Sequence, residues 1–86
     1  MRTVEMLEQS LNVAEKLGYG VRHEWLGGTG GGSCEFGGRR WIFVDLSLGI
    51  DEQLDQVIGS LKADPAIYLQ EVGYELGRLL EFPRAA

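Results

Sequence analysis

Hydrophobic positions near the start of the chain recur at helical spacing. Val4, Leu7, Leu11 and Ala14 follow one another at intervals of three or four residues, which predicts an amphipathic helix over residues 3–17. Charged and amide side chains occupy the opposite side. One side of this helix should therefore pack on a core, and the other should face water.

The pattern then changes from helical spacing to alternation. Residues 19–26 alternate between apolar and polar side chains, which predicts a half-buried first strand. Residues 33–36 predict a short second strand. The third strand, residues 40–46, includes four consecutive apolar residues from Trp41 to Val44, a pattern typical of a strand buried on both faces. We expect this third strand at the centre of the sheet, between the other two strands or next to a second subunit.

A glycine pair fixes the geometry between the second and third strands. Gly37-Gly38 predicts a two-residue type I′ turn, because that turn needs positive φ at both positions. Such a turn makes three cross-strand pairs: Phe36 with Arg39, Glu35 with Arg40, and Cys34 with Trp41. A three-residue turn would shift these partners by one.

Helical spacing returns after the third strand. A second helix is predicted from residue 50, with a buried stripe of Ile50, Leu54, Val57, Ile58 and Leu61. Asp64 and Pro65 are typical of a helix start, and a third helix is expected to continue to Pro83, with Leu69, Val72, Leu76, Leu79 and Leu80 in the core. Helix, three strands and two helices make an α+β fold with a small, mainly antiparallel sheet. We expect residues 1–83 to form one domain and residues 84–86 to be a frayed tail.

Composition narrows the classes of function. Thirteen acidic and eight basic residues give a net charge of −5, which disfavours binding to the phosphate backbone of a nucleic acid. A single cysteine cannot form an internal disulfide, and no apolar run approaches the roughly 20 residues of a membrane span. We therefore expect a cytoplasmic protein that binds neither nucleic acid nor membrane and carries no cofactor.

The glycine-rich segment 27–32 invites comparison with phosphate-binding loops. A P-loop requires a lysine after its last glycine, but Ser33 and Cys34 follow here. A dinucleotide-binding fingerprint fails too, because Ser33 stands where the third glycine should be and a strand follows in place of a helix. Backbone geometry is the simpler role for these glycines. Binding of an anion or small ligand remains an alternative, with Gly28, Gly30, Gly31, Gly32 and Ser33 as the candidate residues.

Catalytic and metal-binding chemistry has few candidates. Cys34 and His23 could form a thiolate–imidazole pair if the strands bring them together. The simpler reading is a buried cysteine facing Phe36 and Trp41 and a partly buried histidine ring. One histidine and one cysteine are too few for a transition-metal site, so we expect no metal.

Aromatic and small residues point instead to contacts between proteins. Trp25, Trp41, Phe43 and Val44 are the candidate interaction residues. If one face of the sheet is left open, either the Ile42–Val44–Leu46 side or the Trp41–Phe43 side would meet a partner. Gly73 and Gly77 lie four residues apart in the expected third helix, where two glycines on one face allow close packing inside the protein or against a second subunit.

About half of the chain resembles a pattern found in small bacterial proteins of unknown function. It consists of a helix, an LG-strand-LGG segment, glycines with a cysteine, a hairpin and a helix, and its most specific part is Leu26 to Cys34. The resemblance implies no activity. The order of elements is also similar to the N-terminal half of small zincin metalloproteases of the antirepressor type. Their helix after the sheet carries HExxH, but residues 50–58 contain no histidine here, so this similarity implies architecture only.

Taken together, these features favour a non-catalytic interaction domain that associates with itself as a homodimer or with another protein. Two alternatives remain open: ligand binding by residues 27–32, and a thiol-dependent enzyme that uses Cys34 and His23.

Overall fold

The computed structural model describes residues 2–29 and 31–82. Gly30, Pro83 and the tail expected at residues 84–86 lie outside the described residues. The elements are α1 (Thr3–Lys16), β1 (Gly20–Glu24), β2 (Gly32–Phe36), β3 (Arg39–Asp45), α2 (Ile50–Lys62), a 3₁₀ helix η1 (Pro65–Leu69) and α3 (Tyr74–Leu79). The α+β class and the order of helix, three strands and further helices are confirmed.

The sheet has the order β1-β3-β2, so the apolar third strand is central as expected. The predicted hairpin register is also confirmed, with Phe36 opposite Arg39 and Cys34 opposite Trp41. Gly37 and Gly38 have φ values of 63° and 77°, as a type I′ turn requires.

The description of the sheet as mainly antiparallel needs correction, because the sheet is mixed. β2 pairs antiparallel with β3, whereas β1 pairs parallel with β3. The chain leaves β1 through the glycine-rich loop and reaches β3 only after the hairpin reverses its direction, which makes β1 and β3 run the same way.

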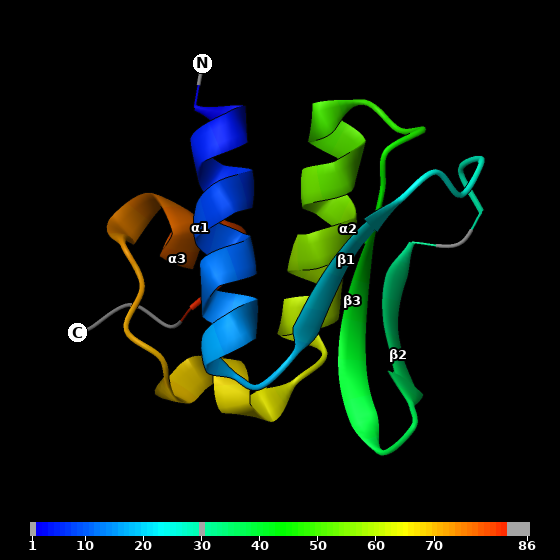
Figure 1. Ribbon diagram of the computed structural model, residues 1–86. Helices are drawn as coiled ribbons and strands as arrows, with labels where there is room; N and C mark the ends of the chain where they lie inside the picture. Colours follow the sequence, from blue (N-terminus) through cyan, green and yellow to red (C-terminus); the bar gives the residue numbers. More distant parts are fainter. Residues whose placement is uncertain (1, 30, 83–86) are drawn as a thin grey trace.

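All the helices lie on one side of the sheet, as Figure 1 shows. Ile42 and Val44 of β3 face this side and are 0% and 1% exposed. They join a core built from α1, α2, η1 and α3, whose other fully buried large side chains include Leu61, Ile67, Leu76 and Leu80. The helices therefore cover the Ile42–Val44 face of the central strand and leave the Trp41–Phe43 face uncovered.

The prediction of one continuous third helix is wrong. Asp64 caps a short 3₁₀ helix, accepting a hydrogen bond from the amide of Ala66, and α3 begins separately after Gly73. Leu69, expected in the core, is 84% exposed because it ends the 3₁₀ turn instead of facing inward from a continuous helix.

The two glycines of this region do not act as a pair. Gly73 is the N-terminal cap of α3 and is exposed, whereas Gly77 is buried within α3. A Cβ atom at Gly77 would meet only side-chain atoms of Val72 and Phe82, at 3.5 and 4.0 Å. These are ordinary van der Waals distances, so the close backbone approach inferred from the Gly73–Gly77 spacing is not present at Gly77.

Candidate functional site

The uncovered face of the sheet, which we call the outer face, carries side chains from all three strands. The register puts Arg22 of β1, Trp41 and Phe43 of β3, and Cys34 and Phe36 of β2 on this face. Phe36 is 75% exposed, Cys34 is exposed, and Trp41 and Phe43 are half-buried. The outer face therefore has an apolar centre, and none of the described helices covers it.

Trp41 lies flat across the neighbouring strand at the centre of the outer face. A Cβ atom at Gly20, directly opposite on β1, would lie 2.5 Å from Cε3 and Cζ3 of the indole, so the ring occupies the space that glycine leaves. The guanidinium carbons of Arg39 and Arg22 lie 4.8 and 5.9 Å from the ring centroid. The shielded indole Nε1 has no hydrogen-bond partner among the described residues.

The glycine-rich loop is organised around a buried carboxylate. Asp45 is 0% exposed and accepts hydrogen bonds from the amides of Leu26 (3.0 Å), Gly28 (2.6 Å) and Ser47 (2.9 Å). Burial alone would raise the pKa of this carboxyl, but the donated hydrogen bonds outweigh burial and hold the pKa below its usual value. The amide of Gly28 thus binds an anion that the protein itself supplies.

The other candidate residues of the loop have structural surroundings of their own. The side chain of Gln56 from α2 occupies the space beside Gly31, where a Cβ atom would clash with Oε1. Gly32 begins β2 with φ 118°, and Ser33 follows on the exposed edge of the sheet. Gly30 lies outside the described residues.

A cluster of Tyr19, Arg40 and Asp64 ties the sheet to the helical layer. Arg40 donates to Oδ2 of Asp64 at 2.6 Å and to the carbonyl of Leu17 at 2.7 Å, and the Tyr19 hydroxyl donates to the same Oδ2 at 2.9 Å. The amide of Ala66, Tyr19 and Arg40 lower the pKa of the Asp64 carboxyl against the effect of burial. Burial and the bond to Asp64 raise the pKa of Tyr19.

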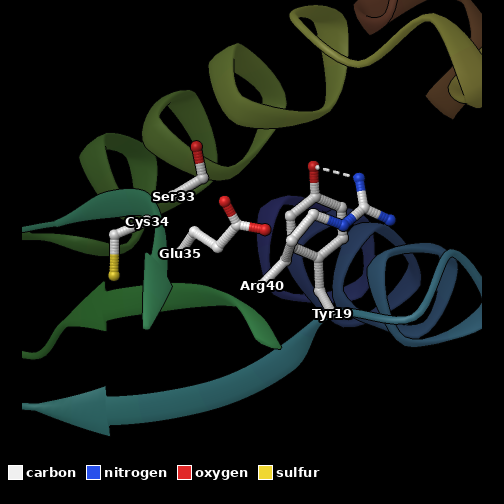
Figure 2. A pocket seen from close by; sticks show the side chains of 5 residues that line it. All are labelled: Tyr19, Ser33, Cys34, Glu35 and Arg40. Atoms are coloured by element: carbon white, nitrogen blue, oxygen red, sulfur yellow. Dashed lines mark hydrogen bonds between the residues drawn. The ribbon is translucent and has the colours of Figure 1, made fainter. Parts of the chain in front are cut away.

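A shallow hollow of about 220 Å³ lies beside this cluster and is lined by Tyr19, Ser33, Cys34, Glu35 and Arg40. Figure 2 shows that Ser33 and Glu35 point toward the helical layer, whereas Cys34 points the other way. The polar groups of Tyr19 and Arg40 that line the hollow already bond within the protein.

The structure does not bring Cys34 and His23 together. Cys34 pairs with Trp41 and His23 pairs with Val44, so the two side chains lie on opposite faces of the sheet and on its two different edge strands. Cys34 is exposed and not a buried hydrophobe, because the helices of the described ranges all lie on the other face, and His23 is exposed at the β1 edge. Among the described residues, no three His, Cys, Asp or Glu side chains gather where they could hold a metal ion.

The four candidate interaction residues separate into three environments. Trp41 and Phe43 lie on the outer face. Trp25 follows the end of β1 and is 75% exposed. Val44 is buried under the helices at 1% exposure, so its selection as a surface residue is wrong, because the alternation of the strand points it inward.

Sequence reasoning missed Asp45 and the Tyr19–Arg40–Asp64 cluster. The sequence did contain a signal for Asp45. A carboxylate at the end of an apolar strand, close to a glycine-rich loop, could have been expected to accept hydrogen bonds from the amides of that loop. The cluster had no comparable signal, because its members are separated by about twenty residues or more along the chain.

Comparison with known proteins identified no relative of this chain. No protein-family model matches the chain, and neither the curated proteins nor the solved structures include a significant match. Within the described ranges, no helix combines the length and apolar character needed to cross a membrane.

Proposed function

We propose that this protein is a non-catalytic self-association domain whose outer sheet face is the contact surface. The observation that carries the proposal is the uncovered centre of the sheet, where Trp41, Phe43 and Phe36 lie on the side opposite the helices. An antiparallel or mixed sheet can face water on one side, but that side is then normally polar. Here it is aromatic.

The chemical makeup of the outer face supports this proposal. Tryptophan, phenylalanine and arginine are enriched at the centres of protein interfaces, and lysine is depleted there. Trp41 and Phe43 are flanked by Arg22 and Arg39, and no lysine lies on the three strands. The face thus combines an apolar centre with planar cations that pack on aromatic rings.

The alternatives have weaker support. The amides of Gly27 and Gly28 already donate to Ser47 and Asp45, which leaves the glycine loop at least two donors fewer for a ligand. Cys34 and His23 lie on opposite faces. No observation among the described residues favours either alternative over self-association.

Sedimentation velocity across micromolar to millimolar concentrations tests the proposal. The expected result is a sedimentation coefficient that rises with concentration. Phe43→Gln, which removes an aromatic side chain from the outer face, should weaken the association constant about tenfold, the effect of losing ~1.4 kcal/mol of contact.

Tyr74→Gln is the matched control for that variant. Tyr74 is also aromatic and is 70% exposed, but it belongs to α3 on the helical side. The control should associate as the wild type does. A protein that stays strictly monomeric at millimolar concentration would rule out self-association.

A further inference from the structure

The sheet ends on one side at β2, which pairs with β3 along one edge and with no strand of the described residues along the other. A type I′ turn closes with a hydrogen bond from the amide of Arg39 to the carbonyl of Phe36, which makes this pair hydrogen-bonded. Hydrogen-bonded and non-bonded pairs alternate along an antiparallel ladder. Cys34 and Gly32 therefore also bond to β3, whereas the amides and carbonyls of Ser33 and Glu35 point away from the sheet.

We propose that the partner in self-association is a second copy of this chain, docked by antiparallel pairing of β2 with β2 about a two-fold axis at Cys34. This inference rests on the proposed self-association and adds a second contact at the β2 edge to the outer-face contact, because pairing along β2 leaves Trp41 and Phe43 of β3 uncovered. The two three-stranded sheets would join into one six-stranded sheet, with the outer faces continuous.

This register uses every free backbone group of the strand. Pairing centred on Cys34 places Ser33 opposite Glu35 of the second copy, and Glu35 opposite its Ser33. These are the two residues whose amides and carbonyls point outward, so both pairs are hydrogen-bonded. The amides and carbonyls that a single copy exposes along this strand edge thereby gain hydrogen-bond partners.

The side chains of the two copies are complementary in the same register. Glu35 faces a serine of the second copy, whereas a register centred on Glu35 would oppose two like charges. On the outer face, Phe36 lies opposite Gly32 of the second copy. A Cβ atom at Gly32 has nothing within 4 Å, so there is room for the ring.

This protein already packs an aromatic ring over a glycine between neighbouring strands. Trp41 covers Gly20 across the β1–β3 pair in that way. Phe36, which is 75% exposed in one copy, would cover Gly32 of the other copy by the same arrangement. The opposite edge of the sheet is less suited to pairing, because β1 carries the Arg22–Glu24 ion pair and charged side chains discourage pairing of edges.

Disulfide trapping at Cys34 tests the register. In the proposed pairing the two Cys34 residues form a non-hydrogen-bonded pair with Cα atoms about 4.5 Å apart, within the range that a disulfide spans. Treatment of the native protein with the thiol oxidant diamide should therefore give a covalent dimer on a non-reducing gel. Each bond forms as two thiols lose two electrons and two protons to the diamide.

The matched control moves the cysteine by one position. In Cys34→Ser/Glu35→Cys the two thiols are offset by two residues along the paired strands, which separates their Cα atoms by about 8–9 Å, beyond disulfide reach. Dimer formation should be at least tenfold slower than in the wild type. Chance collisions would give similar rates at both positions, because both are exposed.

Two further variants should weaken pairing along β2 without removing a hydrogen bond within the single copy. Ser33→Pro deletes an amide that points away from β3, and Phe36→Ala removes a ring that is already mostly exposed. Each should weaken association about tenfold or more in sedimentation velocity, whereas Ser33→Ala should not. Circular dichroism checks that each variant is folded.

The outcomes separate this inference from the proposed function. Association that persists in Ser33→Pro and Phe36→Ala, with equal trapping at positions 34 and 35, would overturn the β2 pairing and leave self-association by another surface. A strictly monomeric wild type would overturn both.

Discussion

Substitution of Gly20 by alanine tests how tightly the outer face is packed. The new Cβ atom would lie 2.5 Å from Cε3 and Cζ3 of Trp41, whereas carbon atoms in contact stay about 3.5–4.0 Å apart. The backbone of Gly20 is not left-handed, so alanine is compatible with the strand itself. The indole must therefore withdraw from the sheet by about 1 Å.

The expected cost follows from two opposing effects. Overpacking costs ~1–3 kcal/mol, and a half-exposed ring can relax toward solvent, so we take about 2 kcal/mol. Alanine regains roughly 0.5–1 kcal/mol over glycine inside a strand. The free energy of unfolding should fall by about 1 kcal/mol, which lowers the melting temperature of a domain this size by ~4–8 °C.

Urea unfolding and tryptophan fluorescence measure the two consequences. A Trp25→Phe background leaves Trp41 as the only tryptophan, and its emission should shift to the red in Gly20→Ala as the ring moves toward water. In a Trp41→Leu background the same substitution should be neutral or slightly stabilising. The double-mutant cycle should therefore give a coupling of about 2 kcal/mol between the two positions.

Gly59→Ala provides the matched glycine control. Gly59 lies in α2, is exposed, and has nothing within 4 Å of a Cβ atom, so alanine should stabilise the helix by up to about 1 kcal/mol. If Gly20→Ala changed stability equally with and without Trp41, the argument that the ring fills the space above Gly20 would be refuted.

Four other predictions concern the carboxylates, Tyr19 and the last helix. Because the folded pKa of Asp64 lies below its ordinary value of 3.8, its contribution to stability should be complete above that pH and lost as the pH falls through the folded pKa, so Asp64→Asn should flatten the acid side of a urea-midpoint profile. Because the pKa of Tyr19 is raised, stability should depend on pH in the opposite direction. The contribution of Tyr19 to the free energy of unfolding should be complete below pH 10.0 and lost at higher pH, and Tyr19→Phe should remove that alkaline loss. Asp45→Asn replaces an acceptor oxygen by a donor against amides such as that of Gly28, so hydrogen exchange in residues 26–28 should accelerate; unchanged exchange would contradict the role of this carboxylate. Gly77→Ala should raise the melting temperature, because its Cβ meets only ordinary contacts and alanine favours the helix by roughly 1 kcal/mol.

The sequence was most informative where structure depends on neighbours along the chain. The spacing of apolar residues located α1 and α2, and Gly37-Gly38 determined the hairpin register, because a two-residue turn leaves only one way to pair Phe36 with Arg39. The uninterrupted run from Trp41 to Val44 correctly placed β3 at the centre of the sheet.

The candidate site was predictable only in part, because both faces of that run are apolar. The sequence Trp41-Ile42-Phe43-Val44 does not indicate whether the helices will bury Ile42 and Val44 or Trp41 and Phe43. The packing of α1 and α2 decides it by burying Ile42 and Val44, and that choice leaves Trp41 and Phe43 on the outer face. Cys34 is exposed for the same reason, since it shares their face.

Long-range contacts decided the remainder. Asp45 accepts hydrogen bonds from the amides of Leu26 and Gly28, so β1 ends before these residues. Arg40 donates a hydrogen bond to Asp64, which lies 24 residues later in the sequence. Turns and helical stripes can be predicted from the sequence because they depend on hydrogen bonds between near neighbours and on the side chains of one segment. The buried face of a sheet and the partner of a buried carboxylate depend on distant segments, and only the tertiary structure determines them.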